Sequence, residues 1–204
     1  MNLVFDKFSI DIWPLGLFTL VIILFVLFRK GKTQSYLICF SLFWVYLMYV
    51  ARVTLFPIPL TGGYADSLRE YSKIWSKVNL IPFYFGTYRN SAYFIIGIIG
   101  NIFLTVPFGF GLKFISQKKN RNAFWVAVVV GLGIELIQLM ISFLLGYQYR
   151  VLDVNDAILN FLGVLLGYWL FRIFAWVYLK LMNRIDLEKR GFGWYLYNVV
   201  KAGE

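Results

Sequence analysis

Apolar and polar residues alternate along the chain in long blocks, and five of the apolar blocks are about 20 residues long. A helix needs about 20 mainly apolar residues to cross the hydrocarbon core of a bilayer, and backbone groups inside lipid must pair within their own segment. The pattern therefore predicts an all-α protein, a polytopic transmembrane helix bundle of about five spans that forms a single membrane domain over residues 1–204. The expected spans are residues 10–28, 36–56, 92–114, 124–145 and 154–179.

Two of the polar stretches carry features of their own. The link at residues 57–91 contains three prolines and a mixed-charge piece, residues 66–77, which favours a short surface helix. Its residues 78–85 are apolar and aromatic but too few to span, so we expect an interfacial or re-entrant segment there. Residues 180–204 form a basic, aromatic-rich and amphipathic tail, which is typical of a segment at the membrane surface.

Composition and charge support a membrane protein with a defined orientation. Of the 204 residues, 60% are hydrophobic and 15% are charged, too few charges to cover a soluble surface. The net charge of +10 comes from basic residues that flank the apolar blocks, so we expect no nucleic-acid partner. Lys and Arg number 12 on one side of the five expected spans and 6 on the other, which predicts the N-terminus outside and the C-terminus inside.

Residue types that are absent exclude several kinds of chemistry. The sequence contains no histidine, which excludes Ser-His-Asp triads, Cys-His pairs and His-ligated zinc within this chain. Cys39 is the single cysteine, so no intramolecular disulfide can form. Acid–base chemistry would have to use a buried carboxylate, for which Glu135 is the candidate.

The fourth and second spans each contain an ionisable residue. Glu135 lies mid-way along the fourth span and shares one helical face with Gly131, Gln138 and Ser142. A charge at the bilayer centre costs at least ~2.5–3.5 kcal/mol, so we expect this face to point into the bundle. Arg52, near the outer end of the second span, is either a snorkelling anchor or an inward group that meets a carboxylate or a bound anion.

A polar series begins before the fifth span and continues into it. From Asp153 onward its members lie at helical spacing on one side of the helix, and Asn101 in the third span adds a further inward group or a helix–helix hydrogen bond. Asp153 is explained equally well as a helix-capping residue, and the GxxxG pair favours close helix packing. The series consists of Arg150, Asp153, Asp156, Asn160, Gly163 and Gly167.

These motifs together resemble VanZ-like proteins, a bacterial membrane family associated with resistance to teicoplanin and other glycopeptides. The resemblance covers about residues 52–170 and implies a multi-pass protein of the bacterial cytoplasmic membrane, but it does not imply a reaction. The matching motifs are Asn79-Leu-Ile-Pro82-Phe83, Asn101 with Pro107-Phe-Gly109, Glu135-x-x-Gln138, and Arg150-x-x-Asp153-x-x-Asp156-x-x-x-Asn160-x-x-Gly163.

Three functions fit these residues. In the first, a polar cavity at the outer leaflet binds or remodels an anionic lipid or a lipid-linked cell-wall precursor, and a glycopeptide antibiotic is a further candidate partner. In the second, an intramembrane enzyme uses a divalent cation on Glu135, Asp153 and Asp156, or these carboxylates as acid and base, to attack a lipid phosphate or glycolipid. In the third, the polar residues only hold a membrane scaffold together. The candidate ligand-binding residues are Arg52, Asn79, Asn101, Glu135, Gln138, Arg150, Asp153, Asp156 and Asn160.

Overall fold

The protein is a helical bundle whose long helices can cross a membrane. The computed structural model describes residues 8–74, 78–84, 92–116, 122–182 and 190–203. Four helices in this part of the chain are long and apolar enough to cross a membrane, and a fifth, α1, is a shorter apolar helix of 17 residues. The all-helical, multi-pass architecture expected from the sequence is confirmed at this level. The helices are α1 (Trp13–Arg29), α2 (Gln34–Thr54), α3 (Gly63–Tyr71), α4 (Ala92–Ile115), α5 (Ala123–Leu145), α6 (Val154–Met182) and α7 (Gly191–Gly203).

Several helix ends follow from local sequence signals. The helix expected from residue 10 begins three residues later, because Phe8–Ile10 forms strand β1 and pairs antiparallel with β2 (Ile58–Thr61). The side chain of Thr33 accepts a hydrogen bond from the Tyr36 amide at the start of α2, and Asn122 does the same for the Phe124 amide in α5. Gly146 ends α5 with a φ of 78°, a left-handed conformation that glycine adopts without steric cost.

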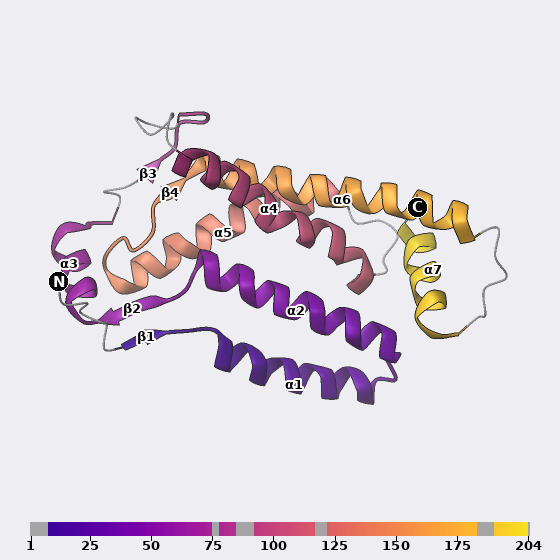
Figure 1. The fold of residues 1–204 in the computed structure, drawn as a ribbon. Coiled ribbons are helices and arrows are strands. Elements are labelled where there is room, and N and C mark those ends of the chain that lie inside the picture. The colour runs from indigo at the N-terminus through magenta and orange to yellow at the C-terminus, as the bar shows by residue number, and fades with distance from the viewer. Residues whose placement is uncertain (1–7, 75–77, 85–91, 117–121, 183–189, 204) are drawn as a thin grey trace.

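Helix α6 is the centre of the bundle. It packs most extensively against α4 and then α5, while the α1–α2 hairpin lies along the α4 side and α7 crosses the far end of α6 (Figure 1). Backbone contact between α4 and α6 depends on three glycines: a Cβ at Gly109, Gly163 or Gly167 would collide with a backbone carbonyl oxygen of the other helix. The close packing expected from the GxxxG pair is therefore confirmed.

The two ends of the bundle differ. One end carries α3, the β1–β2 pair and a short parallel pair, β3 (Val78–Asn79) with β4 (Leu152–Asp153); the other carries the α1–α2 turn, the end of α4, and α7 (Figure 1). Helix α3 overlaps the surface helix expected at residues 66–77. The basic residues of the loops after the first and third expected spans, and those of the tail at residues 180–204, lie at the α7 end where the structure describes them. Residues 117–121 and 183–189 of these stretches, like residues 85–91 of the long link, are outside the described residues.

Apolar side chains cover most of the outer surface of the bundle. Phe18, Val129 and Trp169, on three different helices, are 64%, 69% and 58% exposed, an arrangement suited to a lipid solvent. The buried apolar core is small by comparison and lies where α7 meets α6. Its members are Phe171, Ala175, Tyr195, Val199 and Val200.

Candidate functional site

The polar faces of α5 and α6 point into the bundle, as the helical spacing predicts. Glu135 and Ser142 of α5 are buried, and Asn160 of α6 is almost completely buried. The Glu135 carboxylate Oε2 accepts a hydrogen bond of 3.2 Å from the Asp153 amide. A carboxylate from the middle of one helix therefore fixes the start of the next.

Asp153 joins two distant segments of the chain. Its Oδ1 accepts hydrogen bonds from the Asn155 amide at 2.8 Å and from Asn79 Nδ2 at 2.9 Å. The first bond caps the start of α6, and the second holds β3 beside β4 in parallel register. The capping role and the role in a polar cluster, which the sequence left as alternatives, are thus both present in this one carboxylate.

Asn155 holds an exposed apolar loop in place. Its Oδ1 accepts from the Phe83 amide at 2.7 Å and its Nδ2 donates to the Tyr84 carbonyl at 2.8 Å, an oxygen that also accepts from Asn79. Phe83 has a φ of 62°, a strained value for a residue with a side chain, and these bonds maintain it. We call Asn79, Asp153 and Asn155 the loop clamp. Asn155 was not among the predicted site residues, because it lies off the i, i+3, i+7 face of the helix. Its one signal in the sequence is an Asn at a helix start, where such side chains bond the backbone.

A second polar contact joins α4 to α6. Asn101 Nδ2 donates to Asp156 Oδ1 at 2.5 Å, and one turn further along, Thr105 Oγ1 donates to the Asn160 carbonyl at 2.9 Å. The side-chain Oδ1 of Asn160 is buried and has no hydrogen-bond partner among the described residues. Asn160 therefore sits inside the α4–α6 contact, away from any opening.

Four of the nine expected site residues line one cleft, which we call the Arg150 cleft. Its volume is about 440 Å³. It is bounded by the end of α2, by α3, α4 and α5, by the segment that follows α5, and by the first turn of α6. Asn101, Gln138, Arg150 and Asp156 are the expected residues that line it. The lining residues that the sequence did not single out are Val53, Thr54, Tyr64, Leu68, Leu104, Gln148, Tyr149 and Val151.

Arg150 contributes a positive charge to this cleft. Its Nη2 donates to the carbonyls of Val53 at 3.4 Å and Phe56 at 3.3 Å, both long hydrogen bonds. Among the described residues, no carboxylate oxygen lies within 4.0 Å of its guanidinium nitrogens. Beside it, burial raises the pKa of Tyr149 to about 12 while the Arg150 charge opposes that rise, so the phenol is neutral at physiological pH.

The remaining expected residues lie elsewhere. Arg52 is half exposed and its Nε lies 3.7 Å from Asp11 Oδ2, outside the cleft, which fits a surface anchor. The described part of the chain contains no group of three His, Cys, Asp or Glu side chains that could hold a metal ion. In this structure the Asp153 carboxylate accepts hydrogen bonds within the loop clamp, that of Asp156 accepts from Asn101, and that of Glu135 accepts from the Asp153 amide.

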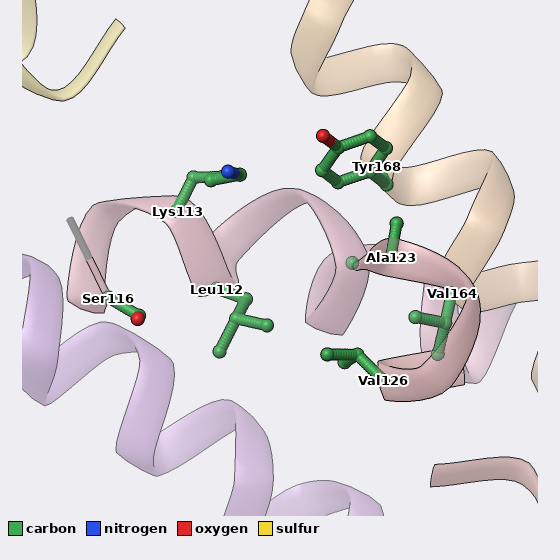
Figure 2. Close-up of a pocket in the computed structure, with 8 residues that line it drawn as sticks. Leu112, Lys113, Ser116, Ala123, Val126, Val164 and Tyr168 are labelled. Atoms are coloured by element: carbon green, nitrogen blue, oxygen red, sulfur yellow. The ribbon is translucent and has the colours of Figure 1, made fainter. Parts of the chain in front are cut away.

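A smaller cavity lies between α4, α5 and α6 near the α7 end of the bundle (Figure 2). Its volume of about 20 Å³ suits a single water molecule. Its polar lining residues are Lys113, Ser116 and Tyr168, and the Lys113 Nζ lies 5.4 Å from the centre of the Tyr168 ring. The Arg150 cleft is therefore the better candidate site for a ligand of lipid-headgroup size.

Comparison with known proteins identifies the family. The VanZ/LLP1 family model matches residues 43–175, which is more than half of the chain and includes every residue of the loop clamp and of the α4–α6 contact. No match was found among curated proteins or among solved structures. With the motifs in place and the family model covering most of the bundle, the chain belongs to the VanZ/LLP1 family.

Proposed function

We propose that this VanZ/LLP1 protein binds an anionic lipid, or a lipid-linked cell-wall precursor, through the Arg150 cleft. The observation that carries the proposal is a guanidinium group without a carboxylate partner among the described residues, placed in a cleft of about 440 Å³. Ligand sites commonly have volumes of ~300–1,000 Å³ and a few convergent polar groups. The ligand class follows from the chemistry of the donors.

A guanidinium has five N–H donors, and the bonds of Arg150 to the described residues use only Nη2. Two of its donors can engage a phosphate in bidentate fashion, and such charge-assisted bonds are roughly twice as strong as neutral ones. Asp156 also lines the cleft, but its Oδ1 is already engaged by Asn101. The Asn101–Asp156 hydrogen bond between α4 and α6 holds one wall of the Arg150 cleft in place, and Arg150 supplies a positive charge on the other wall.

We further propose that the cleft opens at the outer leaflet of the bacterial cytoplasmic membrane, an assignment that the distribution of basic residues supports. The described parts of the basic loops and of the tail lie at the α7 end of the bundle, the end that the positive-inside rule assigns to the cytoplasm. With α1 counted as the first of five spans, the N-terminus is outside and the C-terminus inside. Leu80, Ile81 and Phe83 of the clamped loop are 67%, 63% and 76% exposed, which suits the outer headgroup boundary.

This placement provides a route to teicoplanin-type glycopeptide resistance. Glycopeptides act at the outer surface on cell-wall precursors, so a protein that changes how lipids or precursors are displayed there changes drug binding. The glycopeptide itself need not enter the cleft, whose volume suits a headgroup.

The test compares Arg150→Ala with Lys73→Ala, which removes an exposed basic residue near the same end of the bundle. We expect anionic lipid that co-purifies with the protein, measured by mass spectrometry, to fall about tenfold in Arg150→Ala and to be unchanged in Lys73→Ala. Teicoplanin resistance should fall in parallel while the amount of protein in the membrane stays constant.

Equal lipid content in the two variants would refute the proposal. Disappearance of Arg150→Ala from the membrane would support the scaffold alternative, and release of a labelled product from bound lipid by purified protein would support the enzyme alternative.

A further inference from the structure

A second large cleft opens at the α7 end of the bundle, and the proposed function does not use it. Its volume is about 720 Å³, and it lies between the turn that joins α1 to α2 and the first half of α7. Lys32 contributes from the turn and Arg190 from the residue just before α7, and the lining residues that the structure describes include no Asp or Glu. Both charged side chains in the described lining are therefore cationic.

The neutral groups of this cleft are also suited to an anion. Hydroxyls of Thr33 and Ser35, the amide of Asn198 and the indole of Trp194 line it and supply hydrogen-bond donors. The first turn of α2 forms one wall, and backbone N–H groups of a first helical turn have no partner within the helix. Oxygen anions are the ligands that such a mixture of cations and donors binds.

The α7 wall of the cleft is held in place by hydrogen bonds and packing against the bundle. Tyr195 Oη donates to the Phe114 carbonyl at 2.5 Å, and Tyr178 Oη donates to the Gly193 carbonyl at 3.1 Å. Val199 and Val200 are buried against α6. Helix α7 is thus docked on the bundle, and its start faces the α1–α2 turn across the cleft.

We propose that this α2–α7 cleft binds a phosphate-bearing anion, which is the headgroup of an anionic phospholipid in the leaflet at the α7 end of the bundle. The aromatic residues Tyr36 and Trp194 in its walls, and the half-exposed Phe192 on α7, are typical of the interfacial depth where headgroups lie. A soluble phosphate compound offers the same chemistry, and the experiment separates the two sources.

The experiment is native mass spectrometry of the full-length protein titrated with phosphatidylglycerol or with phosphatidylcholine. It compares the double variant Lys32→Gln/Arg190→Gln with Arg29→Gln/Lys30→Gln, which removes the same charge from the same surface but from residues that do not line the cleft. Carrying out the titration in an Arg150→Ala background removes the contribution of the Arg150 cleft. Asn198→Trp provides a variant that fills the cleft without a change in charge.

We expect the cleft double variant to lose at least about tenfold in phosphatidylglycerol affinity, and the control double variant to lose less than about twofold. Asn198→Trp should lose as much phosphatidylglycerol affinity as the cleft double variant. If that double variant fails to fold, the affinity of Asn198→Trp tests the proposal in its place. Displacement of phosphatidylglycerol by inorganic phosphate at equal concentration would identify a soluble phosphate as the ligand. Equal losses in the two double variants, or full binding by Asn198→Trp, would overturn the proposal.

Discussion

The contact between α4 and α6 makes a sharp prediction about single methyl groups. Gly167→Ala places a Cβ against the Val106 carbonyl and 2.9 Å from the Phe110 amide nitrogen, both on α4. Gly100→Ala, in α4 itself, adds the same methyl group where no other atom lies within 4 Å. The two substitutions share the change in helix propensity, so their difference isolates the packing of the two helices.

The size of that difference follows from which atoms obstruct the methyl group. Overpacking a tight site typically costs about 1–3 kcal/mol. The obstacle here is backbone, which cannot rotate away as a side chain can, so α4 and α6 must separate. Gly→Ala on an open helical face stabilises by up to about 1 kcal/mol. We therefore expect Gly167→Ala to be less stable than Gly100→Ala by about 1–3 kcal/mol.

The measurement is reversible unfolding of the purified variants in mixed detergent micelles. Gly163→Ala, whose Cβ would meet Thr105 Oγ1 and the Ile102 carbonyl, should behave like Gly167→Ala, and Gly133→Ala, in open space on α5, like Gly100→Ala. If Gly167→Ala unfolds at the same or a higher detergent concentration than Gly100→Ala, the helices are not in backbone contact and the reasoning fails.

Two further predictions concern the polar end of the bundle. Asn155→Ala removes the acceptor of the Phe83 amide, so we expect faster hydrogen exchange at residues 81–84, with a local cost of about 1–3 kcal/mol; unchanged exchange there would contradict the loop clamp. Tyr149 has a folded-state pKa of about 12, above its ordinary value of 10, so folding opposes its ionisation. The contribution of Tyr149 to the free energy of unfolding is complete below pH 10 and is lost as the pH rises from 10 toward 12. Unfolding measured at pH 8 and at pH 11 should therefore show the wild type losing stability relative to Tyr149→Phe. A constant difference between the two proteins across this range would rule out a buried phenol.

The periodicity of the sequence was sufficient for the features that depend on a single helix. The inward face of α5 that carries Glu135, the glycine pair of α6 and the long apolar helices all follow from a spacing of 3.6 residues and from the cost of charge in lipid. Asp156 was likewise placed on an inward face. These inferences succeed because each depends on residues within one turn or two of each other.

Pairing between distant segments was decided only by the tertiary structure. Asn79 meets Asp153, 74 residues away, and Arg52 turns to Asp11 and not into the bundle; no local pattern carries either fact. The sequence suggested one shared cavity for all nine residues, whereas the fold divides most of them between the loop clamp, the α4–α6 contact and the Arg150 cleft. The physical reason is that hydrogen bonds select partners by position in space, which helix packing sets after each helix has already formed.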